Sequence, residues 1–102
     1  MPSFSNNSKR ILGECDPRLQ IIMNLAIQIM DFKVTSGKRG EAEQNQLYEE
    51  GKTKLKYPNS YHNTEPFSSA VDIAPYPIDW EDAERFRLLA GIVIGISELL
   101  GH

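Results

Sequence analysis

The chain of 102 residues carries 14 acidic and 11 basic side chains, which gives a formal net charge of −3 at pH 7. Its length allows one small domain, residues 1–102, and its 40% hydrophobic and 25% charged residues are ordinary for a globular protein. The acidic balance argues against a dedicated nucleic-acid-binding protein, because such proteins are usually basic.

The cysteine count and the hydropathy pattern argue against a disulfide-stabilised, secreted or membrane-spanning protein. Cys15 has no second cysteine to pair with, so no intramolecular disulfide forms and a reducing compartment is acceptable. The first ten residues, MPSFSNNSKR, contain no apolar signal-peptide segment, and no apolar run is long enough to span a bilayer. We therefore expect cytoplasmic synthesis without a signal peptide and no membrane span.

The first predicted element is a helix that follows a polar arm. Residues 1–15 lack a clear period, which predicts an arm or a docked loop. Asp16 suits the N-cap of a helix and Pro17 its first helical position. Apolar side chains then recur at helical spacing, at Leu19, Ile22, Met23, Ala26 and Met30. This pattern predicts a helix over residues 17–31 that packs on a sheet.

A strand, a turn and a second helix are predicted next. Residues 32–36 alternate apolar and polar side chains, as half-buried strands do. The run SGKRG at residues 36–40 is typical of a turn. Residues 41–50 are good helix formers with acid in the first turn, and Gly51 suits the position just after a helix.

A long loop is predicted over residues 51–68, and it contains His62. Loops of this length in a small domain are usually functional or mobile. Residues 69–74 then predict a strand in which Asp72 shares a face with Ala70 and Ala74. A carboxylate among alanines needs a partner, because an unpaired buried charge is costly. A metal ion or an arginine would serve.

The last predicted element is a helix over residues 80–100, with Asp79 as its N-cap. Its apolar residues occupy most of its circumference, so it should be covered on most sides. Only Gly101 and His102 follow it. We therefore expect that the natural fold continues, or that another chain supplies the cover, as in a homo-oligomer formed through this helix.

His62 and Asp72 are a candidate pair of metal ligands. Imidazole nitrogen and carboxylate oxygen both suit Zn²⁺, although a catalytic zinc site normally takes three protein ligands and a water. Other interpretations are open. His62 would also serve as a loop histidine bonded to backbone, and Asp72 as an acid paired with Arg39 or Lys38.

Three segments in a fixed order resemble the motifs of one enzyme family. They are Ser36-Gly37-Lys38-Arg39 with Gln44 and Leu47-Tyr48, then Ser60-x-His62 with Ala70-Val71-Asp72, then Pro75-Tyr76 with Asp79-Trp80. Together they resemble the zinc peptidases that cut bacterial cell-wall peptides: the D-Ala-D-Ala carboxypeptidases and dipeptidases and their relatives, the phage endolysins. The third segment is especially similar to the endolysin branch.

The resemblance implies an α+β fold in which helices pack on a small antiparallel sheet, the DD-peptidase or hedgehog-like fold. It implies zinc ligands at His62 and Asp72, a catalytic Arg39 that stabilises negative charge on the scissile carbonyl, and substrate-binding residues at Gln44 and Ser60. The implied reaction is hydrolysis of a peptidoglycan peptide bond by water whose pKa zinc lowers to about 7. A surface arginine, a surface amide and a turn serine are the plain alternatives for Arg39, Gln44 and Ser60.

The chain departs from the family pattern in two ways. The spacing from His62 to Asp72 is longer than the commonest family spacing and contains no glycine. The family also continues after the long helix, into a segment that carries an acidic general base and a third zinc ligand. We therefore expect a C-terminally truncated domain without the C-terminal strand segment. Candidates for the third ligand are His102, Glu65 and a residue of a partner chain.

Two functional expectations follow. The first is a zinc-dependent, endolysin-like peptidase that acts on peptidoglycan peptides. The lack of a signal peptide suits an enzyme made in the cytoplasm that reaches the host cell wall after holin-type release. The second is an inactive remnant that at most binds metal, cell wall or another protein.

Overall fold

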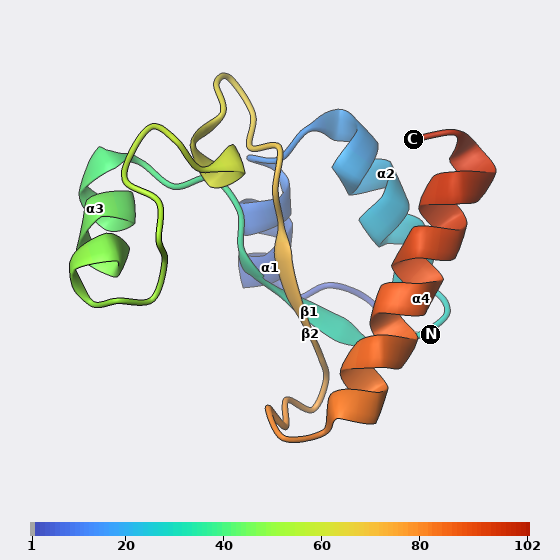
Figure 1. Ribbon diagram of the computed structural model, residues 1–102. Coiled ribbons are helices and arrows are strands. Elements are labelled where there is room, and N and C mark those ends of the chain that lie inside the picture. The colour runs from blue at the N-terminus through green and yellow to red at the C-terminus, as the bar shows by residue number, and fades with distance from the viewer. Residues whose placement is uncertain (1) are drawn as a thin grey trace.

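Two antiparallel strands form the centre of the fold in the computed structural model, which describes residues 2–102. The helices are α1 (Asn6–Leu12), α2 (Pro17–Ala26), α3 (Glu41–Glu49) and α4 (Ala83–Leu100), with a 3₁₀ turn at Tyr61–Asn63. The strands are β1 (Phe32–Ser36) and β2 (Asp72–Pro75). In Figure 1 the sheet separates α2 and α4 on one side from α3 on the other. The predicted α+β class with a small antiparallel sheet is confirmed.

The register of the sheet changes next to Asp72. Phe32 pairs with Pro75 and Val34 with Ile73, but Ser36 rather than Thr35 pairs with Asp72. The irregularity inserts one extra residue in β1, and such bulges re-aim neighbouring side chains. The Thr35 hydroxyl donates to the Asp72 carbonyl at 3.2 Å. The strand ends that carry Ser36 and Asp72 are thereby fixed to each other.

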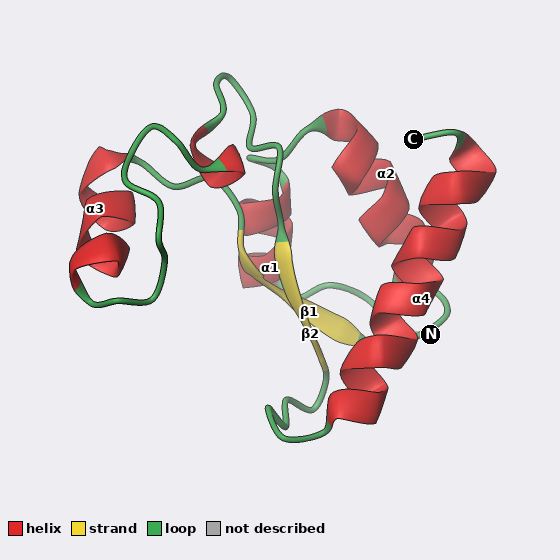
Figure 2. Ribbon diagram, in the orientation of Figure 1, coloured by secondary structure: helices red, strands yellow, loops and turns green. Residues whose placement is uncertain are grey.

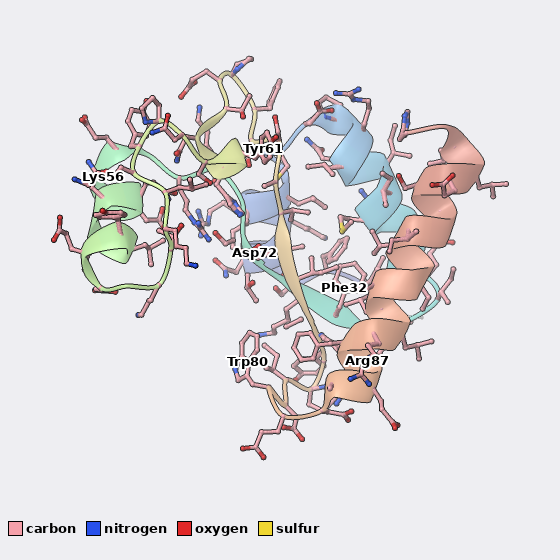
Figure 3. The ribbon with its side chains drawn as sticks, in the orientation of Figure 1. Phe32, Lys56, Tyr61, Asp72, Trp80 and Arg87 are labelled. Carbon is pink, nitrogen blue, oxygen red and sulfur yellow. The ribbon has the colours of Figure 1, made fainter. Side chains whose placement is uncertain are left out.

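The hydrophobic core lies between the sheet, α1, α2 and α4. Its buried members are Phe4, Ile11, Leu12, Cys15, Ile22, Met23, Ala26, Ile27, Phe32, Val34 and Leu89. Phe32 lies between the sheet and α4 in Figure 3 and meets Phe4 edge to face, with ring centroids 5.3 Å apart. Burial of such aromatic rings is a major source of stability in a domain of this size.

Residues 1–15 were predicted as an arm or docked loop, and this prediction is wrong for residues 6–12, which form α1. Ser5 caps the helix by accepting the Ser8 N–H at 3.2 Å. Only Ile11 and Leu12 supply apolar anchors, so seven residues carry too few to show a helical period. The Ser8 hydroxyl accepts the Val34 N–H at 3.1 Å and ties the helix to β1.

The other helices begin or end at different residues than predicted. α2 ends at Ala26, and residues 27–30 form a turn instead of the last helical turn. α4 begins at Ala83, because Asp82 is its cap and accepts the Arg85 N–H at 3.2 Å. Asp79 caps a preceding turn instead, through the Glu81 N–H at 3.0 Å. The second strand also begins later, at Asp72.

α4 is incompletely covered. Of its 18 residues only Leu89 is fully buried, while Leu88, Ile94 and Leu99 are 58%, 61% and 87% exposed. α2 and β2 pack against one side of it. Within residues 2–102, no helix is both long and apolar enough to cross a membrane.

Between α3 and the 3₁₀ turn the chain runs without regular structure, as the predicted long loop required (Figure 2). The loop is tied back to α3 at two points. Gln44 donates its side-chain N–H to the Leu55 carbonyl at 2.7 Å, and Asn45 accepts the Tyr57 N–H at 3.0 Å. These bonds set the approach of the chain to His62.

Candidate metal centre

His62 lies in the 3₁₀ turn and is held there by local capping. Ser60 accepts the His62 backbone N–H on its hydroxyl at 3.2 Å, and Asn63 accepts the Ser60 N–H on its side chain at 3.0 Å. This reciprocal arrangement is a capping box, formed here by a serine and an asparagine. Ser60, His62 and Asn63 are all buried, so the turn is a rigid support for the imidazole ring.

The imidazole ring of His62 is oriented by the backbone of Gly37. Its Nδ1 lies 2.7 Å from the Gly37 carbonyl oxygen. A carbonyl only accepts, so Nδ1 carries a proton and donates it. In the neutral ring Nε2 then presents its lone pair. Metal-binding histidines commonly have this arrangement, with one ring nitrogen bonded to a carbonyl and the other free for the ion.

Nε2 of His62 faces the carboxylate of Asp72, with Oδ1 at 3.4 Å. In the neutral ring these two atoms are both acceptors, so they need a shared proton or cation between them. Two ligand atoms at the usual zinc distances lie about 3.4 Å apart in tetrahedral geometry. The donor types and their separation therefore fit two of the ligands of a zinc ion.

Asp72 is the half-exposed member of the pair, with 50% of its side chain accessible. Its Oδ2 accepts from Arg39 Nη2 at 2.9 Å, so the carboxylate bridges the arginine and the imidazole. When the ring is protonated, Nε2–H of His62 donates to Asp72, and this bond lowers the pKa of Asp72; the charges of His62 and Arg39 lower it further, while burial opposes the shift. Asp72 is therefore ionised and ready to bind a cation at neutral pH.

Arg39 is anchored on both its backbone and its side chain. Its N–H donates to the His62 carbonyl at 2.8 Å, and its Nε donates to the Ser36 hydroxyl at 3.1 Å. The guanidinium is mostly buried and pairs with Asp72, as one of the open interpretations held. Lys38, the other proposed partner of Asp72, bonds Glu65 instead, at 2.8 Å. Arg39 thus lies at the centre beside the two candidate ligands.

Gln44 and Ser60, which the resemblance implied as substrate contacts, are both buried. Gln44 has no exposed surface, and its amide is occupied by Leu55 and Asn63. Ser60 is buried and caps the turn of His62. Through these bonds both side chains support the loop, and their contact with substrate stays a prediction.

The structure adds Gly37 to the centre, a residue for which no separate role was predicted from the sequence. A Cβ on Gly37 would lie 2.9 Å from the Cys15 sulphur and 3.0 Å from the Ile11 carbonyl oxygen. Only glycine permits this approach of β1's end to the end of α1. The glycine in the motif Ser36-Gly37 was the available signal, but its contact partners lie far away in the sequence.

A third ligand is not gathered at this centre. Across residues 2–102, no three His, Cys, Asp or Glu side chains are placed to hold one metal ion. Glu65 bonds Lys38. His102 lines a separate cavity of about 210 Å³ together with Asp16 and Ser97. Neither His102 nor Glu65, the two candidates within this chain, therefore joins His62 and Asp72.

Comparison with known proteins gives two findings. The family model described as phage L-alanyl-D-glutamate peptidase matches residues 2–102. The crystal structure of Serratia marcescens L-Ala D-Glu endopeptidase ChiX superposes with a TM-score of 0.81 at 24% sequence identity, over 97% of this chain and 74% of that chain. No curated protein matches the chain significantly. The ChiX likeness establishes the shared fold.

Proposed function

Because the chain belongs to the family of phage L-alanyl-D-glutamate peptidases, we propose that it is a zinc-dependent hydrolase of peptidoglycan peptides, with the L-alanyl-D-glutamate bond as its target. The observation that carries the zinc proposal is the 3.4 Å separation between Nε2 of His62 and Oδ1 of Asp72. The family description favours this bond over the D-alanyl-D-alanine bond of the related carboxypeptidases.

In this proposal His62 and Asp72 hold the zinc ion. Zinc, when bound, supplies a Lewis acid and a water of lowered pKa. The Gly37 carbonyl keeps the His62 ring in the tautomer whose Nε2 binds metal. Arg39 anchors Asp72 and places a permanent positive charge where the scissile carbonyl would develop negative charge. A further ligand and an acidic base complete the chemistry in the family that the sequence resembles.

A second candidate function is binding without hydrolysis. It is favoured by the lack of a three-ligand cluster within residues 2–102. In that case the chain is an inactive relative that keeps the scaffold and the two ligands, and at most binds metal or cell wall. The partner in both cases is the peptide part of bacterial peptidoglycan. Synthesis in the host cytoplasm and access to the wall after holin-type release remain part of the same proposal.

Zinc titration by calorimetry, combined with a peptide-release assay on purified peptidoglycan, tests the proposal. We expect equimolar zinc binding that His62→Ala and Asp72→Ala each abolish. His102→Ala is the matched control, because His102 is the second of the two histidines and lies outside the centre. Release of new L-Ala C-termini and D-Glu N-termini supports the peptidase. Zinc binding without release supports the binding function, and absence of zinc binding contradicts both metal roles.

A further inference from the structure

We infer that Asn63 is a positioning residue that fixes Arg39 and His62 relative to each other. Asn63 follows His62 in the 3₁₀ turn and is 4% exposed. It cannot touch a substrate from this position, and it carries no charge. Its role in hydrolysis rests on the proposed function, but its effect on the geometry of the centre does not.

The side-chain amide of Asn63 is fully used. Its Oδ1 accepts the Ser60 N–H at 3.0 Å. Its Nδ2 donates to the Arg39 carbonyl at 2.9 Å and to Gln44 Oε1 at 3.3 Å. One side chain thus joins the 3₁₀ turn, the segment after β1 and helix α3. A buried amide with both ends satisfied holds its neighbours in one arrangement, because breaking any bond leaves an unpaired polar group.

Arg39 is attached to this turn at two points. Its carbonyl accepts from Asn63, and its N–H donates to the His62 carbonyl at 2.8 Å. Bonds to both the carbonyl and the N–H of Arg39 fix the orientation of its backbone, whereas one bond alone would let the residue rotate about that bond. Gly37 lies in the same segment as Arg39, and its carbonyl accepts the hydrogen bond from the His62 ring. The arginine and the histidine ring are therefore set by one hydrogen-bonded unit.

The loop before His62 has a separate attachment. Gln44 donates to the Leu55 carbonyl through its Nε2 and accepts from Asn63 on its Oε1. Loss of the Asn63 donations therefore leaves the bond between the loop and α3 in place. This separation lets the positioning role be tested apart from the folding of the loop.

Asn63→Asp is the informative variant. The carboxylate keeps the size of the side chain and the acceptor for Ser60, but its second oxygen faces the oxygens of Arg39 and Gln44. Asn59→Asp is the matched control, since Asn59 is an exposed asparagine of the same loop. Ile22→Val controls for a general loss of stability, because Ile22 lies in the core on α2.

Two readouts are measured at one fixed pH. The first is zinc affinity by calorimetry, which we expect to fall about 10- to 100-fold in Asn63→Asp, as for other residues that orient metal ligands. The second is the ¹⁵N chemical shifts of the His62 ring and of Arg39 Nε in the metal-free proteins. We expect both sets to move in Asn63→Asp and to stay unchanged in Asn59→Asp and Ile22→Val.

Wild-type zinc affinity and unchanged ¹⁵N shifts in Asn63→Asp would overturn the positioning role. An equal effect of Ile22→Val would also overturn it, because the effect would then follow stability alone. If Asn63→Asp does not fold, Asn63→Ser replaces it, and failure of both to fold shows a purely structural residue. If the wild type binds no zinc, the proposed function fails, and the ¹⁵N shifts alone decide the role of Asn63.

Discussion

Gly37 packs so closely on Cys15 that a Cβ at position 37 would lie 2.9 Å from the buried sulphur. The same glycine offers its carbonyl to the His62 ring. Gly37 therefore links the packing of Ile11 and Cys15 to the orientation of the His62 ring. A substitution that disturbs this packing should also move the His62 ring.

Gly37→Ala should reduce stability by about 1–3 kcal/mol, as overpacking of a core does. It should also weaken zinc binding, because the carbonyl that orients His62 must move. Urea unfolding and zinc calorimetry measure the two effects. Gly40→Ala is the control, since a Cβ there meets nothing within 4 Å. Wild-type stability in Gly37→Ala would show that Cys15 and Ile11 shift to accept the methyl group without loss of folding free energy.

Gln44→Leu should destabilise the protein by about 1–3 kcal/mol, because it leaves the Leu55 carbonyl and one Asn63 donor unpaired. Gln46→Leu on the exposed side of α3 is the control, and its effect should stay within about 0.5 kcal/mol. Urea unfolding of both variants decides the matter. A Gln44→Leu protein that is as stable as wild type but fails to bind a wall peptide would support the substrate-contact interpretation.

Stability should fall in acid as Asp72 and Asp16 become protonated. The pKa of Asp72 is lowered by its bond to His62, and that of Asp16 is lowered to about 2 by its bonds to Arg18. A carboxyl whose folded pKa lies below its ordinary value of 3.8 stabilises the fold above that pH. This contribution is lost as the pH falls from 3.8 toward the folded pKa.

Melting temperatures between pH 5 and pH 2 measure this loss. Asp72→Asn and Asp16→Asn should each flatten the decline relative to the wild type. Glu81→Gln is the control, because Glu81 is exposed and none of its side-chain atoms bonds within the described chain. A decline of wild-type steepness in both Asp variants would assign the acid sensitivity to other carboxyl groups.

The uncovered side of α4 should promote self-association if a second copy covers it. Leu88 and Ile94 are each more than half exposed on this helix. In sedimentation velocity we expect the wild type to shift to a larger species as concentration rises, and Leu88→Ser with Ile94→Ser to remain monomeric. Leu55→Ser, at an exposed apolar position off α4, is the control. A monomeric wild type at all concentrations would exclude the homo-oligomer.

Local sequence signals were sufficient to predict the kind of each major element but not its limits. Asp16 and Pro17 start α2 as expected, because capping depends on a few adjacent residues. The predicted start of α4 was wrong because Asp79 and Asp82 both have capping chemistry: Asp79 caps the turn before the helix, and Asp82 caps the helix itself. The short α1 was missed because its stability comes from contact with β1.

The candidate site was predictable where residue type carries the chemistry. A histidine and an aspartate in a recognisable motif indicated a candidate ligand pair, and the structure brings His62 Nε2 and Asp72 Oδ1 to 3.4 Å, while zinc binding by the pair stays a prediction. Gly37 and Asn63 were not predictable in the same way. One contributes a backbone carbonyl and the other a buried amide, and both depend on contacts between distant segments. Gln44 shows the converse, since a motif position turned out to be buried.

The irregular pairing of Ser36 with Asp72 also bears on the order of folding. Asp72 gains its place only when β2 meets β1, and His62 gains its place only when its turn reaches Gly37. Both contacts join segments distant along the chain, so their loop-closure entropy must be overcome before either forms. We therefore expect each half of the centre to form only after its two distant segments have met, and a chain in which they have not met holds no paired His62 and Asp72.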